Sequence, residues 1–192
     1  MKSKTHKLTV TAMLGAVATV LMFLEFPLPF LIPGFIKMDF SELPALLAAF
    51  SLGPVSGAAV CLIKNLAHLF QTSTGGVGEL ANFLLGCCFV VPAGLIYSKS
   101  KTRKGALLGA IVGAVIMAAI SVPINYYVTY PIYSKFLPID AIINMYQQLR
   151  PGVDGLWECL LVFNMPFNAL KGLLDMAVAF LIYKPLSPLL HR

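Results

Sequence analysis

Residues 105–130, GALLGAIVGAVIMAAISVPINYYVTY, decide the class of this protein. The run contains no aspartate, glutamate, lysine or arginine, and it is longer than the stretch of about 20 apolar residues that a helix needs to cross a bilayer. The remaining chain is similar, since 58% of the 192 residues are hydrophobic and only 11% are charged. Soluble domains carry charge on about a quarter of their residues. The sequence therefore predicts an integral protein of the cell membrane.

Together with this run, the other apolar segments predict an all-α membrane fold with six transmembrane helices and a single domain over residues 1–192. The segments cover residues 8–24, 41–52, 54–71, 78–98, 105–130 and 159–184. The first follows a basic start that resembles a signal peptide, but its apolar run is too long for one, so we expect a retained helix. The second reaches only about 18 Å at about 1.5 Å per residue, and by its length alone it could be re-entrant.

Positive charge indicates that segment 41–52 does cross. With six crossings and both termini in the cytoplasm, nine of the 14 lysines and arginines lie inside, three lie outside and two lie within helices. The nine are Lys2, Lys4, Lys7, Lys99, Lys101, Arg103, Lys104, Lys184 and Arg192, and the three are Lys37, Lys135 and Arg150. Without that crossing, the cluster at 99–104 would lie outside, against the positive-inside rule. The net charge of +6 then reports basic cytoplasmic loops, and we expect no nucleic-acid partner.

The connection at residues 25–40 is apolar and rich in proline, which is unusual for a solvated linker. Proline fixes φ and favours an extended path. We expect this outer loop to fold back as a cap on the helix bundle.

Polar side chains recur on one face of the last segment. Asn164, Asn168, Lys171 and Asp175 follow one another at spacings of 4, 3 and 4 residues, which places them along one side of a helix. Ionisable groups in spanning segments cost about 2.5–3.5 kcal/mol each on insertion scales, so they face a cavity or a partner. One interpretation is an interhelical seam in which Lys171 and Asp175 form an ion pair. The other is an outward-facing pocket into which Asn168 and Lys171 project.

Other apolar segments also carry polar groups, namely Lys64, His68, Glu79, Asn82 and Asn125. Lys64 is either a counter-ion of the scaffold or a ligand contact, and we expect His68 at the membrane interface. The tyrosines at 126, 127 and 130 form either an aromatic belt or a wall that stacks on a flat ligand.

No catalytic constellation accompanies these groups. The chain has no H-E-x-x-H, G-x-S-x-G or P-loop motif, and its three histidines are scattered. The four cysteines form no C-x-x-C pair, and we expect neither a metal site nor a cofactor. A binding protein is favoured over an enzyme; the alternatives from other classes are a membrane enzyme that uses Asp175 or Glu79 and a structural subunit without a ligand.

Small residues mark one side of the first segment. Ala12 and Ala16 form a small-xxx-small pair that lets another helix approach closely, either within this chain or in a partner.

These features together resemble the substrate-binding (S) components of energy-coupling factor (ECF) vitamin transporters, in particular those that bind riboflavin. The resemblance covers nearly the whole chain. The stretches that carry it are Phe26-Pro27-Leu28-Pro29-Phe30, Asp39-Phe40-Ser41-Glu42-Leu43-Pro44, Gly53-Pro54-Val55, Lys64-Asn65-Leu66, Ala81-Asn82-Phe83-Leu84, Asn125-Tyr126, Pro166-Phe167-Asn168, Lys171-Gly172 and Ala12-x-x-x-Ala16.

The resemblance implies a six-helix protein that binds riboflavin from outside and delivers it with a transmembrane coupling subunit and two cytoplasmic ATPases. It implies that Asn168 and Lys171 bind the polar edge of the isoalloxazine, that Asn125 assists, and that Ala12 and Ala16 dock on the coupling subunit. The wider set of expected ligand contacts adds Asn82, Glu79, Lys64, Phe40, Leu43 and Tyr130. Another vitamin or precursor is the alternative ligand. Riboflavin is uncharged at neutral pH and needs directional donors and acceptors, which asparagine supplies.

Overall fold

A computed structural model describes residues 4–191, and the side chains of residues 4–182. Lys2, Arg192 and the side chain of Lys184, which entered the charge count, lie outside the described residues. The fold is all-helical apart from one two-stranded hairpin, which confirms the predicted class. The elements are α1 (Lys4–Phe23), β1 (Phe26–Pro27), β2 (Lys37–Met38), α2 (Glu42–Leu52), α3 (Pro54–His68), η1 (Leu69–Gln71), α4 (Val77–Lys99), α5 (Arg103–Ile124), η2 (Asn125–Thr129), α6 (Tyr130–Tyr133), α7 (Ile139–Gln147), α8 (Gly155–Cys159), η3 (Leu160–Asn164) and α9 (Met165–His191).

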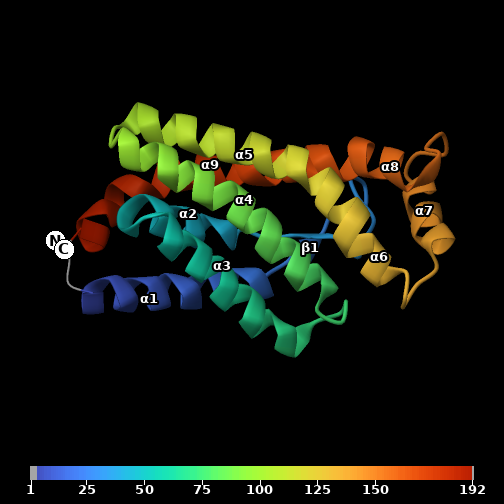
Figure 1. Ribbon diagram of the computed structural model, residues 1–192, viewed down its shortest axis with the longest axis horizontal. Helices are drawn as coiled ribbons and strands as arrows, with labels where there is room; N and C mark the ends of the chain where they lie inside the picture. Colours follow the sequence, from blue (N-terminus) through green and yellow to red (C-terminus); the bar gives the residue numbers. More distant parts are fainter. Residues whose placement is uncertain (1–3, 192) are drawn as a thin grey trace.

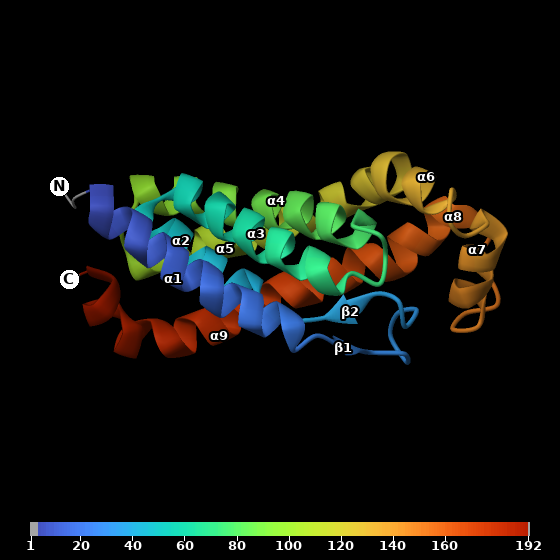
Figure 2. The ribbon, with the colours of Figure 1, turned by 90° about the horizontal axis from the view of Figure 1, so that it is seen from below.

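The helices run along the long axis of an elongated bundle (Figures 1 and 2). The start of α1, the end of α9 and the turn between α4 and α5 lie together at one end, called here the terminal end. The short helices α6, α7 and α8 lie at the opposite end, called here the capped end.

Four described helical segments are long and apolar enough to cross a membrane: Lys4–Phe23, Val77–Lys99, Arg103–Tyr133 and Gly155–Ile182. The short helix α2 has a different environment from these four. Residues 42–50 are all buried, and Ala45, Leu46 and Ala48 are fully so, because α1, α3, α4 and α9 surround the helix. The 11 residues of α2 are therefore typical of a buried core helix.

Glycines allow α4 and α5 to approach closely. A Cβ atom at Gly113 would lie 2.3 Å from the carbonyl oxygen of Phe89, and one at Gly109 would lie 2.7 Å from that of Ala93. Any larger residue would force these two helices apart, so the small residues of α5 set the spacing of the bundle.

The loop at residues 25–40 packs onto the capped end, as its composition predicts. Its two short strands pair in antiparallel register, Phe26 with Met38 and Pro27 with Lys37. Ile32 and Met38 are buried in an apolar cluster with residues of α5, α7 and η3. The hairpin therefore brings Asp39, directly after β2, against the start of α9.

Candidate functional site

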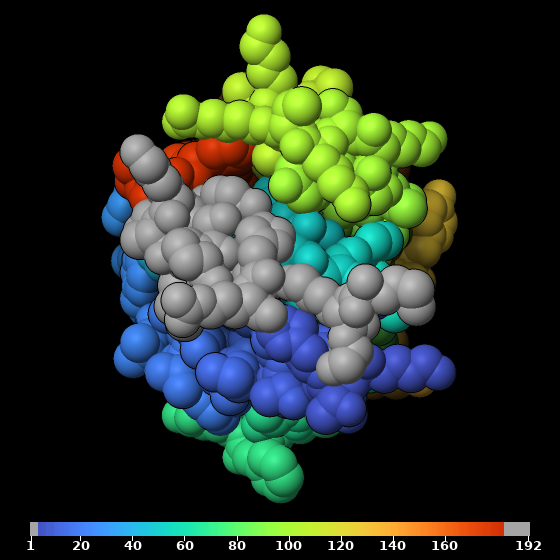
Figure 3. All heavy atoms as spheres, turned by 90° about the vertical axis from the view of Figure 1, so that its left-hand side faces the viewer, coloured from blue at the N-terminus to red at the C-terminus, as the bar shows by residue number. Residues whose placement is uncertain are grey.

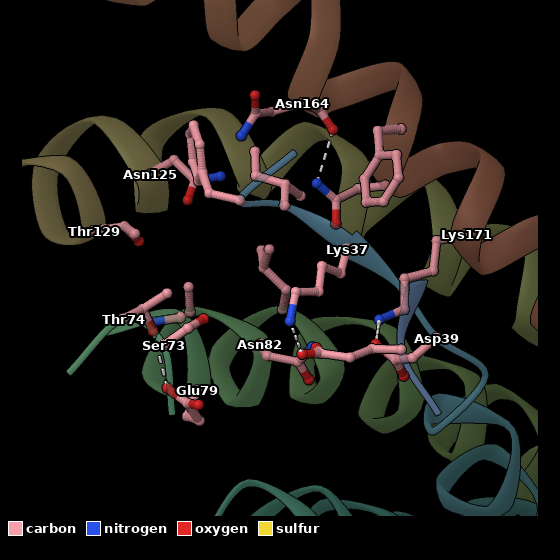
Figure 4. A pocket seen from close by; sticks show the side chains of 18 of the residues that line it. Lys37, Asp39, Ser73, Thr74, Glu79, Asn82, Asn125, Thr129, Asn164 and Lys171 are labelled. Atoms are coloured by element: carbon pink, nitrogen blue, oxygen red, sulfur yellow. Dashed lines mark hydrogen bonds and ion pairs between the residues drawn. The ribbon is translucent and has the colours of Figure 1, made fainter. Parts of the chain in front are cut away.

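A polar pocket lies within the capped end, between the hairpin loop, the start of α4, η2 and the start of α9 (Figure 4). Its volume is about 140 Å³, and a second cavity of about 540 Å³ adjoins it. The two share Phe35, Lys37, Ser73, Thr74 and Tyr133 as lining residues. Pockets that bury small molecules measure about 300–1,000 Å³. The polar pocket alone is smaller than this range, so a vitamin-sized ligand would extend into the adjoining cavity or displace part of the lining.

Six of the nine residues predicted to contact a ligand line this pocket: Glu79, Asn82, Asn125, Tyr130, Asn168 and Lys171. Lys64, Phe40 and Leu43 do not. Lys64 is fully buried behind Asn82. Leu43 lies in the first turn of α2 and joins the central core, while Phe40 precedes that turn and is only partly buried.

Lys171 forms ion pairs with two carboxylates from another part of the chain. Its Nζ lies 2.8 Å from Asp39 Oδ2 and 2.9 Å from Glu42 Oε2. The interpretation in which Lys171 pairs with Asp175 is wrong, because Asp39 and Glu42 occupy the ammonium group instead. Asp175 is fully buried, and neither of its carboxylate oxygens has a hydrogen-bond partner among the described residues.

Lys64 is held on the other side of the Glu42 carboxylate. Its Nζ donates to Glu42 Oε1 and Ser41 Oγ, each at 2.5 Å, and to Asn82 Oδ1 at 2.9 Å. This arrangement supports the counter-ion interpretation of Lys64. Glu42 thus bridges both lysines, and the two positive charges are balanced by Glu42 and Asp39. Burial alone would raise the pKa of Asp39, but Lys171 and Lys64 outweigh burial and hold the pKa of this loop carboxyl well below its usual range.

A second network lines the pocket nearer the hairpin. His68 Nδ1 lies 2.8 Å from Glu79 Oε1, and its Nε2 lies 3.7 Å from Glu25, which also pairs with Lys37. Glu79 in turn accepts a bond from Thr72 at 2.9 Å. His68 is the last residue of α3 and is only 5% exposed. Its position at the membrane interface stays a prediction.

Two π-helical turns place asparagines on the pocket wall. Asn125 begins η2, and Asn164 ends η3, and both side chains are buried at the cavity. A π-turn shifts the helix register by one residue and is frequent at functional sites. Prolines at 123, 131 and 166 flank these turns, and they are the sequence signal that could have indicated them.

The tyrosines of this region divide between the two expected roles. Tyr127 is 70% exposed on the outer surface of the bundle, and Tyr126 contacts Trp157 edge to face with ring centroids 5.1 Å apart. Tyr130 is buried and lines the pocket. The first two therefore have the exposure of an aromatic belt.

In a comparison with known protein families, residues 6–183 match the family described as "ECF transporter, substrate-specific component". The chain belongs to this family. The S component is 36% identical over 186 residues to riboflavin transporter RibU of Staphylococcus aureus (strain TCH60), covering 97% of this chain and 93% of that one. It is 34% identical over 192 residues to riboflavin transporter FmnP of Bacillus subtilis (strain 168), covering 98% and 96%.

A solved structure described as the S component of a bacterial ECF transporter superposes with a TM-score of 0.77 at 33% identity, covering 99% of this S component and 100% of that chain. These findings confirm the resemblance, and they identify a transport component of the cell membrane with several spanning helices. They also confirm that the S component is not an enzyme, because its relatives are transporters.

The small-xxx-small pair of α1 is exposed in this S component. Ala12 and Ala16 face outward with Met13 and Val17, whereas Gly15 and Ala18 pack inward. A Cβ atom at Gly15 would lie 3.0 Å from the side chain of Ile63 on α3. The contact between α1 and α3 therefore uses a different face, and the face with Ala12 and Ala16 is open to another helix.

Proposed function

We propose that this protein is the riboflavin-binding S component of an ECF vitamin transporter. The observation that carries the proposal is the chemistry of the pocket. Its buried lysine and carboxylates are paired with one another, and the uncharged polar groups that line the cavity are four carboxamides and several hydroxyl groups. Such a wall suits an uncharged ligand with several directional donors and acceptors. The riboflavin transporters that share 34–36% of their residues with this chain support the same ligand.

In the proposed complex, Asn168 and Lys171 bind the polar edge of the flavin ring. Asn168 Nδ2 donates to the backbone oxygen of Asn164 at 2.8 Å, so its Oδ1 is the atom left to accept from the ring N–H. Lys171 has a third ammonium proton beyond its two carboxylate partners, which it can donate to a ring carbonyl. Asn125 and Tyr130 complete this side of the site.

The opposite wall is proposed to bind the hydroxylated chain. Asn82 Oδ1 is occupied by Lys64, which leaves its Nδ2 to donate, and Glu79 is an acceptor nearby. Lys64 acts here by orienting Asn82. Phe40 and Leu43 line neither cavity, so they reach a ligand only when the adjacent loop moves.

We further propose six spans with both termini in the cytoplasm. The exposed basic residues Lys99, Lys101, Arg103 and Lys104 lie at the turn between α4 and α5, and Lys4 and Lys7 lie in the first turn of α1. Both segments belong to the terminal end, which faces the viewer in Figure 3. The positive-inside rule places this end in the cytoplasm. The pocket then opens to the outside, where a vitamin is captured. Ala12 and Ala16 would dock on a transmembrane coupling subunit that works with two cytoplasmic ATPases.

Uptake of labelled riboflavin tests this proposal. A riboflavin-auxotrophic bacterium without its own flavin transporter should grow on low riboflavin, and should accumulate the label, only when this chain and ECF coupling and ATPase subunits are expressed together. Omission of the ATPases is the control for passive entry. Accumulation of a different vitamin, with none of riboflavin, would contradict the assignment.

A further inference from the structure

A chain of three buried side chains lies behind the pocket wall. The hydroxyl groups of Tyr130 and Tyr146 lie 2.5 Å apart, and the Tyr146 hydroxyl donates to Asn164 Oδ1 at 2.7 Å. The three side chains are 2%, 0% and 4% exposed. Asn164 and Tyr130 line the pocket, whereas Tyr146 does not. Tyr146 belongs to α7, in the connection that caps the bundle, and it touches the ligand space only through its neighbours.

The orientation of the Asn164 amide sets the direction of the hydrogen bonds along this chain. A phenol has a single proton, and that of Tyr146 is used on Asn164, so Tyr130 donates to the Tyr146 oxygen. If the Asn164 amide were turned around, its Nδ2 would donate to Tyr146, Tyr146 would donate to Tyr130, and the Tyr130 proton would have to find its acceptor in the pocket. Burial raises the pKa of Tyr146 well above its ordinary value, so this hydroxyl keeps its proton.

These bonds orient the Asn164 carboxamide in one direction. Its carbonyl oxygen accepts from Tyr146, and its Nδ2 points into the cavity in Figure 4. Asn168 has the opposite arrangement, because its Nδ2 is used on the Asn164 backbone and its Oδ1 has no hydrogen-bond donor among the described residues. With Lys171 as the next group, the wall presents a donor, an acceptor and a donor along one helix face.

We propose that Tyr146 is a positioning residue that sets ligand specificity by holding the Asn164 amide with its N–H groups toward the pocket. This inference rests on the proposed function, because its ligand is riboflavin. The uracil-like edge of the flavin carries a ring N–H between two carbonyl groups, the complement of a donor–acceptor–donor wall. Asn164 donates to one of those carbonyls only while Tyr146 prevents the amide from turning.

The test compares riboflavin with its 2-thio and 4-thio analogues, in which one carbonyl oxygen is replaced by sulfur, a weak acceptor. Affinities are measured by titration calorimetry on purified parent and Tyr146→Phe protein. A net hydrogen bond changes affinity by about three- to tenfold, so the parent should prefer riboflavin over one analogue by at least about that factor. In Tyr146→Phe that ratio should fall by about threefold or more. Loss of affinity for all three ligands at unchanged ratios would mean that Tyr146 only supports the fold, and would overturn the proposal.

Asn164→Ala gives a second test if the tyrosine variant does not fold. It removes the same donor from the pocket and should lower the same ratio, and Tyr146→Phe added to it should change the ratio no further. An unchanged ratio in Asn164→Ala would also overturn the proposal. Failure of the parent itself to bind riboflavin would count against the proposed function, and is thereby distinguished from failure of the Tyr146 assignment.

Discussion

Lys171→Met keeps the stem of the side chain and removes its three donors. In the proposed complex the variant loses the bond from the ammonium group to a flavin carbonyl. A hydrogen bond that involves a charged group contributes about 1.5–3 kcal/mol. At about 1.4 kcal/mol for each factor of ten, riboflavin affinity should fall by about one to two orders of magnitude.

The same change also disturbs the charges beneath the pocket. Asp39 and Glu42 lose a shared partner, although Asp39 keeps the Ser41 backbone N–H at 2.8 Å and Glu42 keeps Lys64. One negative charge is then left without compensation in a buried site, which is destabilising. We therefore expect a lower melting temperature. Adding Asp39→Asn removes the surplus charge and should restore the melting temperature but not riboflavin binding.

Quenching of riboflavin fluorescence by the purified proteins measures the affinity, and thermal unfolding in the same detergent measures the stability. Asp175→Asn is the matched control, because Asp175 lies one helical turn further along α9 and neither of its carboxylate oxygens is hydrogen-bonded to the described residues. It should bind riboflavin like the parent and be at least as stable. The reasoning is refuted if Lys171→Met binds as tightly as the parent, since Lys171 would then be a scaffold residue only.

Three further predictions concern topology, assembly and packing. A cysteine replacing Lys101 should resist an impermeant thiol reagent in intact cells; labelling there would refute the six-span orientation. Ala12→Trp or Ala16→Trp should impair uptake but spare binding, because the face they share is exposed; equal loss of both would place this face inside the chain. Gly113→Ala should lower the melting temperature, since its Cβ atom would lie 2.3 Å from the Phe89 oxygen; an unchanged melting temperature would show that α4 and α5 can separate freely.

The sequence alone was sufficient for the features that depend on local periodicity. The shared face of Asn164, Asn168 and Lys171 follows from helical spacing, and their position at the pocket agrees with it. The apolar composition of residues 25–40 likewise indicated a loop that packs on the bundle. Hydropathy also located α2, but could not show that this helix is enclosed by its neighbours.

Long-range pairing was beyond the same reasoning. Asp39 and Lys171 are 132 residues apart, and their ion pair depends on the path of the hairpin rather than on any periodic pattern. Helical spacing offered Asp175 as one possible partner, but it could not show that the hairpin brings two other carboxylates to the ammonium group. The hydrogen bond from Tyr146 to Asn164 was missed for the same reason. Tyr146 lies in a separate helix, α7, so no helical periodicity relates its position to that of Asn164.

The ligand itself is tested most directly by the flavin content of the purified protein. Protein isolated from cells grown with riboflavin should be yellow, and denaturation should release one flavin per chain, identified by its absorbance and mass. Lys171→Met protein prepared in parallel should release much less. Parent protein that is colourless, does not quench added riboflavin, and is stabilised against heat by a different vitamin would contradict the account.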